Sequence, residues 1–267
     1  MIKNNRPSEN PDIRITWLQT PLHWQNPEAN LEMFSRKLKN IPEGTDLLVL
    51  PEMFTTGFSM EAEKLAEDMS GPGIHWLEQK AADKGCVITA SLIIRDRGRY
   101  FNRLIWMRPD GTFCHYDKRH LFRMAGEHRF FSPGNHRVVT ELKQWRIRPL
   151  ICYDLRFPVW SRSLDDTDIL IYIANWPEAR SRAWKILLPA RAVENQCYAL
   201  GVNRVGKDGK GLAYSGDSGL YDAKGETIRM CPPHTEGMET AVLSWKGLQN
   251  FRSKFQAALD ADRFEVL

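Results

Sequence analysis

Short apolar runs that stop abruptly at a polar residue place the strongest limit on how this chain can fold. Residues 46–50 run into Pro51 and then Glu52, and residues 169–174 run directly into Asn175. Nearly continuous apolar runs of this length are typical of strands that are covered on both faces. The sequence therefore predicts sheets that lie between other layers of structure.

Helical and strand patterns alternate along the rest of the chain, and several strand pairs are joined by hairpin turns. We expect helices over 27–39, 74–84, 184–196 and 248–259. We expect strands over 13–18, 46–50, 86–94, 99–107, 112–116, 138–142, 145–152, 169–174, 198–205, 214–221, 227–230 and 240–245. This alternation predicts an α/β fold of mixed sheets covered by helices, not a helical bundle or an all-β barrel.

The length and composition are those of an ordinary globular chain. It has 267 residues, of which 42% are hydrophobic and 26% charged, and it shows neither a repeat nor an interdomain linker. We expect a polar N-terminal leader over 1–12, which does not resemble a signal peptide. A single domain is expected over 13–267, ending in a helix and a tail.

The net charge and the cysteine content limit which binding partners and which cell compartment we expect. The formal charge of +4 is small and no long basic block occurs, so we do not expect nucleic acid as a partner. No run approaches the ~20 apolar residues of a membrane helix, so no membrane partner is expected. The five cysteines are widely spaced, which argues against a disulfide framework and favours the cytoplasm.

Three reactive side chains stand at the ends of expected strands. Glu52 follows 46–50, Lys118 follows 112–116, and Cys152 ends 145–152. If these strands share one sheet edge, the three groups converge. A thiol with an unperturbed pKa of about 8.5 becomes a nucleophile only as thiolate. A nearby ammonium would lower that pKa, and a carboxylate could accept the proton.

The segments around these residues resemble a known family. Residues 50–58, 116–122 and 151–158 look like the three signature blocks of the nitrilase superfamily of carbon–nitrogen hydrolases. Residues 184–196 resemble that family's helix, and the similarity extends from residue 13 to about residue 245. Four blocks in the same order and spacing make a far more specific signal than any one of them.

The resemblance implies a four-layer α-β-β-α sandwich with two mixed sheets. It also implies that Glu52, Lys118 and Cys152 are catalytic, and that Glu127 is the family's second glutamate, which positions substrate or water. Neither a cofactor nor a metal is implied, and a homodimer or larger homo-oligomer is.

Residues 51–58, 152–158 and 174–177 carry a finer resemblance, to the omega-amidase branch. Its members hydrolyse the side-chain amide of dicarboxylic acid monoamides such as α-ketoglutaramate, through a cysteine thioester and with release of ammonia. The expected substrate is therefore a small amide that carries a carboxylate. For the pocket we nominate a set of aromatic, arginine and backbone contributors: Phe58, Tyr153, Arg156, Trp176 and Arg180.

Individual pocket residues have plainer alternatives. Arg156 could instead form a structural ion pair with Asp154, and Arg180 could be a solvated loop residue. Phe58 and Trp176 could simply belong to the core. The backbone N–H of Tyr153 is expected to help Lys118 stabilise an oxyanion.

Other functions remain open at this point. The same three residues would serve an aliphatic amidase, a nitrilase or an N-carbamoyl amide hydrolase, and a catalytically silent binding module could share the fold. A cysteine–histidine hydrolase would use His120 or His128 as its base. A metal site built from Cys114, His115 and His120 is disfavoured, because neighbouring strand residues face opposite ways.

Overall fold

Two six-stranded sheets form the framework of the protein in the computed structural model, which describes residues 12–162 and 167–262. The expected leader, apart from Asp12, and the last five residues of the expected tail lie outside the described residues. Across the described ranges, every helix is too short or too polar to cross a lipid bilayer.

The first sheet has the strand order β14-β1-β2-β3-β4-β5. Its strands are β1 (Ile13–Gln19), β2 (Leu47–Val49), β3 (Val87–Asp96), β4 (Arg99–Met107), β5 (Phe113–Asp117) and β14 (Gly237–Leu243). The central pairs β1–β2 and β2–β3 are parallel, and the outer pairs are antiparallel. The sheet is therefore mixed, as expected.

The second sheet has the order β13-β12-β9-β8-β7-β6 and is mixed in the same way. Its strands are β6 (Thr140–Leu142), β7 (Trp145–Ile151), β8 (Ile169–Ala174), β9 (Tyr198–Asn203), β12 (Gly219–Tyr221) and β13 (Thr227–Met230). A separate two-stranded hairpin consists of β10 (Val205–Lys207) and β11 (Ala213–Ser215).

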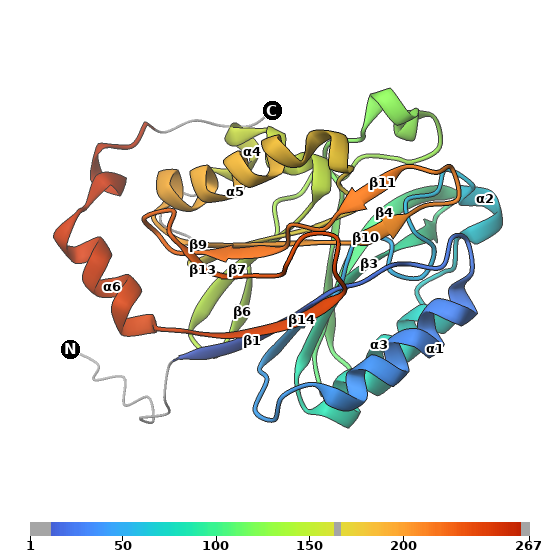
Figure 1. Cartoon of the computed structure of the whole chain (residues 1–267), viewed down its shortest axis with the longest axis horizontal. Coiled ribbons are helices and arrows are strands. Elements are labelled where there is room, and N and C mark those ends of the chain that lie inside the picture. Colours follow the sequence, from blue (N-terminus) through green and yellow to red (C-terminus); the bar gives the residue numbers. More distant parts are fainter. Residues whose placement is uncertain (1–11, 163–166, 263–267) are drawn as a thin grey trace.

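Helices cover the outer faces of both sheets (Figure 1). The α-helices of the described residues are α1 (Pro27–Lys37), α2 (Ala62–Leu65), α3 (Pro72–Lys84), α4 (Pro158–Ser161), α5 (Ser181–Asn195) and α6 (Trp245–Lys254). Helices α1 and α3 lie side by side on the first sheet, and α5 lies on the second. The predicted four-layer α-β-β-α sandwich is confirmed.

Alternation along the strands divides the apolar side chains between two cores. On β4, Leu104 and Trp106 face the second sheet, where they join a large cluster that includes Ile147 and Ile171. Ile105 faces the opposite way, into a second cluster beneath α1 and α3. Because strands in both sheets are covered on two faces, their sequences read as the continuous apolar runs noted above.

The structure corrects some of the expected boundaries. The strand expected over 214–221 is interrupted, because Gly216 and Asp217 both adopt positive φ angles, 79° and 58°. The final helix begins at Trp245, not at 248, because the side chain of Ser244 accepts a hydrogen bond from the Gly247 N–H and so caps it. That helix ends at Lys254, five residues earlier than expected.

Candidate active site

The three reactive residues come from both sheets. Glu52 follows β2 and Lys118 follows β5 in the first sheet, whereas Cys152 follows β7 in the second. The expectation that their strands share one sheet edge is therefore wrong. The groups meet because the two sheets are packed face to face, with equivalent strand ends directed to the same side of the sandwich.

Lys118 lies between two carboxylates at the base of the site. Its Nζ is 2.9 Å from Glu52 Oε1 and 3.0 Å from both carboxylate oxygens of Glu127. All three side chains are completely buried. Each charge is therefore removed from water and depends on the others for its stabilisation.

Further hydrogen bonds fix the orientation of the Glu52 carboxylate. The amide of Asn102 donates to Oε1 at 2.8 Å, and the backbone N–H of Asn175 donates to Oε2 at 2.7 Å. The Asn175 side chain also donates to the Glu52 carbonyl at 2.6 Å. Sequence reasoning missed Asn102 altogether, because a buried asparagine within β4 has no local feature that marks it.

Cys152 stands at a sharp turn. It has a φ of 46°, in the left-handed region that a cysteine rarely adopts, and it opens the short 3-10 helix η4 (Cys152–Arg156). Its thiol is close enough to Glu52 and Lys118 for both charges to act on its pKa. Backbone strain of about 1–3 kcal/mol is commonly retained at sites of chemistry.

The pKa of the Cys152 thiol is shifted in the opposite direction to the one expected from the sequence. Burial raises the pKa of Cys152 well above its usual value, the Glu52 charge raises it further, and the opposing effect of Lys118 is smaller. Burial also raises the pKa of Glu127. For Lys118, burial favours loss of the proton, but the charges of Glu127 and Glu52 outweigh it and raise the pKa. The resting site thus combines a neutral thiol with a permanent ammonium.

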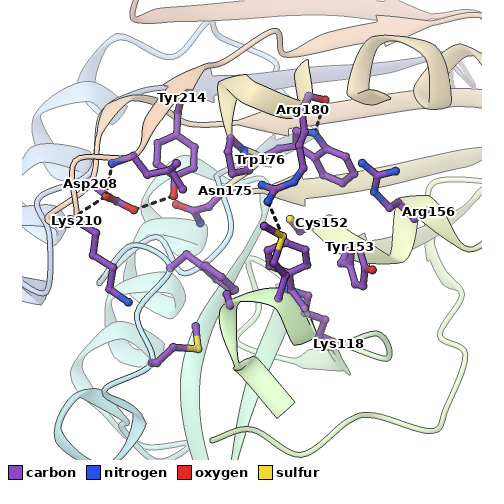
Figure 2. A pocket seen from close by; sticks show the side chains of 17 residues that line it. Lys118, Cys152, Tyr153, Arg156, Asn175, Trp176, Arg180, Asp208, Lys210 and Tyr214 are labelled. Carbon is purple, nitrogen blue, oxygen red and sulfur yellow. Dashed lines mark hydrogen bonds between the residues drawn. The ribbon is translucent and has the colours of Figure 1, made fainter. Parts of the chain in front are cut away.

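A cavity of about 210 Å³ opens directly onto these groups (Figure 2). It is lined by 17 residues, among them Lys118, Cys152 and all five nominated pocket residues: Phe58, Tyr153, Arg156, Trp176 and Arg180. Glu52 and Glu127 are not among the lining residues, and both contact the Lys118 ammonium from behind it.

Aromatic rings and cations face one another around this cavity. The Lys118 ammonium lies 4.9 Å from the centroid of the Phe58 ring. The guanidinium of Arg156 lies over Trp176 at 5.2 Å, and that of Arg180 lies over Phe122 at 5.0 Å. Stacking of this kind holds arginines in place while leaving their N–H donors available to an anion.

The hairpin β10–β11 forms the opposite wall, which the sequence did not predict. It contributes Asp208, Lys210, Leu212 and Tyr214 to the lining, and Figure 2 shows Asp208, Lys210 and Tyr214 on the side away from Tyr153 and Arg156. The Tyr214 hydroxyl donates to Asp208 Oδ2 at 3.0 Å. The buried guanidinium of Arg204 lies 4.7 Å from the Tyr214 ring, so this wall is firmly supported from behind.

With this geometry in view, the comparison with protein families is decisive. The family model described as "Carbon-nitrogen hydrolase" matches residues 14–253. The chain belongs to the carbon–nitrogen hydrolase family.

Named relatives of this hydrolase carry more specific descriptions. It is 48% identical over 258 residues to omega-amidase YafV of Escherichia coli strain K12, covering 96% of this chain and 99% of that protein. It is 31% identical over 219 residues to 2-oxoglutaramate amidase of Bacillus subtilis, covering 80% and 84%. The relatives thus include two kinds of amidase by name.

A solved structure agrees with the fold. The CN-hydrolase superfamily protein XC1258 from Xanthomonas campestris, which has an arsenic adduct in its active site, superposes with a TM-score of 0.94. It is 43% identical and covers 96% of this chain and 99% of its own.

Neither of the two histidines considered as a rival base lines the cavity that contains Cys152. The Nδ1 of His120 lies 2.8 Å from Asp154 Oδ1, and His128 is exposed. Within residues 12–162 and 167–262, no three His, Cys, Asp or Glu side chains cluster in a way that could hold a metal ion. The alternative for Arg156 was an ion pair with Asp154. Its guanidinium lies instead over Trp176, and hydrogen bonds from Tyr116, Ile151 and His120 occupy the Asp154 carboxylate.

Proposed function

We propose that this hydrolase is an omega-amidase, which cleaves the side-chain amide of a small dicarboxylic acid monoamide such as α-ketoglutaramate. The observation that carries the proposal is the buried Glu52–Lys118–Glu127 cluster beside the Cys152 thiol, at the base of a cavity with arginines on its wall. The named amidase relatives support the choice of an amide as substrate.

The size and charge of the cavity favour a small anionic substrate. At about 210 Å³ it is smaller than the ~300–1,000 Å³ pockets that hold drug-sized ligands. Arg156 and Arg180 line it together with Cys152. A guanidinium pairs with a carboxylate through two parallel hydrogen bonds, so we assign the remote carboxylate of the substrate to this pair of arginines.

The protonation states of the resting site determine how acylation begins. Because the thiol is neutral, Glu52 accepts its proton as Sγ bonds to the amide carbonyl carbon. The Lys118 ammonium and the Tyr153 N–H stabilise the oxyanion of the tetrahedral intermediate. When the C–N bond breaks, Glu52 returns the proton to nitrogen, and ammonia leaves behind a thioester on Cys152.

Hydrolysis of the thioester repeats these steps with water. Glu52 takes a proton from the water as its oxygen attacks the thioester carbonyl, and Lys118 again faces the oxyanion. Glu127 holds Lys118 in place through both of its carboxylate oxygens. The C–S bond then breaks, Glu52 protonates the sulfur, and the dicarboxylic acid is released.

Ammonia release from a substrate panel tests the proposal. Succinamate and α-ketoglutaramate should be hydrolysed at least ten times more efficiently than butyramide, a nitrile or an N-carbamoyl compound. Cys152→Ala should abolish turnover and leave the unfolding transition intact. Full activity in that variant, or a preference for the uncharged amide, would contradict the assignment.

The two arginines can be tested separately. Arg156→Gln and Arg180→Gln should each raise KM for succinamate and leave KM for butyramide nearly unchanged, because only the former carries a carboxylate. Lys185, which is on α5 and about half exposed, offers a control position. Lys185→Gln should change neither KM.

Three further properties belong to this proposal. We place the enzyme in the cytoplasm, in keeping with its five free cysteines. We treat 13–267 as one domain, since a single core cluster contains residues of both sheets. We propose a homodimer or larger homo-oligomer, which sedimentation analysis would reveal.

A further inference from the structure

The turn that carries Cys152 encloses a buried carboxylate that the proposed mechanism does not use. Asp154 is completely buried, two residues after the cysteine. Its Oδ2 accepts hydrogen bonds from the Tyr116 hydroxyl at 2.7 Å and from the Ile151 N–H at 3.0 Å. Its Oδ1 accepts the His120 N–H at 3.0 Å and faces His120 Nδ1 at 2.8 Å. Four contacts on two oxygens use the full accepting capacity of a carboxylate.

The hydroxyl of Tyr116 has one possible direction in which to donate. Its oxygen receives Trp160 Nε1–H at 2.9 Å and the Arg119 N–H at 3.3 Å. Both of these partners are donors, so the hydroxyl hydrogen points to Asp154. Burial and the Asp154 charge raise the pKa of Tyr116 well above its usual value, which keeps that hydrogen in place at all working pH values.

The partners of Asp154 lie symmetrically about the catalytic lysine. Tyr116 is two residues before Lys118 and His120 is two residues after it, while Asp154 is two residues after Cys152. Tyr116 is on β5, which ends at Asp117, directly before Lys118. The network therefore joins the strand end of one sheet to the nucleophile turn of the other.

From this geometry we infer that Asp154 is a positioning residue, which acts through Tyr116, His120 and the Ile151 N–H to set the place of Cys152 relative to Lys118 and Glu52. The inference rests on the proposed function only in taking Cys152 as the nucleophile. By accepting the N–H that immediately precedes Cys152, Asp154 holds the cysteine at its φ of 46°. Without that acceptor the turn can relax and carry the sulfur away from Glu52.

Asp154→Asn is the principal test. An amide nitrogen in place of Oδ2 would face two donors, the Tyr116 hydroxyl and the Ile151 N–H, and in place of Oδ1 it would face the His120 N–H. At least one contact is therefore lost in either orientation. A displacement of about 1 Å costs roughly 100-fold in rate. We expect kcat with succinamate to fall about that far, with KM changed less than threefold. Tyr116→Phe, which removes one hydroxyl and keeps the ring, should lower kcat by about tenfold.

Asp168→Asn is the matched control. Asp168 is equally buried, accepts the Arg146 N–H and guanidinium, and accepts Arg252 Nη1 at 2.6 Å. It directly precedes β8, at the end remote from Asn175. Loss of this carboxylate should lower the unfolding temperature as Asp154→Asn does, and leave kcat within about twofold of the wild type.

A second measurement does not depend on any substrate. The pH dependence of Cys152 alkylation by iodoacetamide, followed by peptide mass spectrometry, reports how buried and how close to Glu52 the thiol is. In Asp154→Asn and Tyr116→Phe its apparent pKa should fall toward that of an ordinary thiol, and in Asp168→Asn it should not. Because it needs no turnover, this measurement stands even if the omega-amidase assignment fails.

Each outcome of these experiments either supports the inference or overturns it. A lower kcat together with a shifted alkylation profile, in Asp154→Asn or in Tyr116→Phe if the former does not fold, supports the inference. An alkylation profile like that of the wild type in the folded variant overturns it, as does a kcat equal to that of Asp168→Asn.

Discussion

Replacement of Lys118 by methionine should show how strongly the buried charges of the active site depend on one another. Its ammonium lies 2.9 Å from Glu52 and 3.0 Å from Glu127, and none of the three side chains has any solvent exposure. Methionine has a similar length and no charge, so Lys118→Met leaves two carboxylates buried without a cation. Breaking a buried pair by removal of one partner costs about 3–5 kcal/mol. Since one cation here serves two anions, we expect a loss near 5 kcal/mol at pH 8.5.

The loss should depend on pH in a defined direction. Burial raises the pKa of Glu127, and without the ammonium the largest effect that opposes this rise is gone. A group whose pKa is raised on folding contributes its full stability below the unfolded pKa, and this contribution is lost as pH rises through the folded pKa. The deficit of Lys118→Met relative to the wild type should therefore be smaller at pH 5.5 than at pH 8.5.

Urea denaturation followed by tryptophan fluorescence gives the required free energies at both pH values. Lys185→Met is the control, because Lys185 is 48% exposed and 3.5 Å from Asp217, and such surface pairs contribute about 0–1 kcal/mol. Addition of Glu127→Gln to Lys118→Met removes one of the unpaired anions and should recover part of the loss. The reasoning would be refuted by equal deficits for the two lysine variants at pH 8.5, or by a larger deficit at pH 5.5.

Two further variants test residues that hold the active site in place. Glu127→Gln puts an amide where both oxygens now accept from Lys118 and one also accepts the Phe122 N–H at 2.5 Å. It should cost about 1–3 kcal/mol of unfolding free energy and lower kcat more than tenfold; steady-state ammonia release at wild-type level would contradict this role. In Gly134→Ala the new Cβ would lie 2.2 Å from the Asp117 carbonyl oxygen, so thermal unfolding should show a loss of about 1–3 kcal/mol. Gly247→Ala, whose Cβ would come no closer than 3.3 Å to another atom, is the comparison that should remain nearly neutral.

Much of the fold could be predicted because its signals are local. Three features each depend on residues that are close together in sequence. They are the apolar run that ends before Glu52, the helical spacing of apolar residues in the segment that forms α5, and the turn between β4 and β5. One error arose where a distant contact decided the outcome. The strand expected over 214–221 breaks at Asp217, whose carbonyl accepts Trp184 Nε1 and whose carboxylate accepts Ser181.

The sequence by itself determined which side chains we propose as catalytic, because Glu52, Lys118, Cys152 and Glu127 lie in short segments whose residue order marks them. Only the tertiary structure decided how they are held. Glu52 receives donors that are 50, 66 and 123 residues away in the chain, and no local pattern can report such distant partners. The protonation of the Cys152 thiol is decided in the same way, since burial between two packed sheets outweighs the neighbouring ammonium.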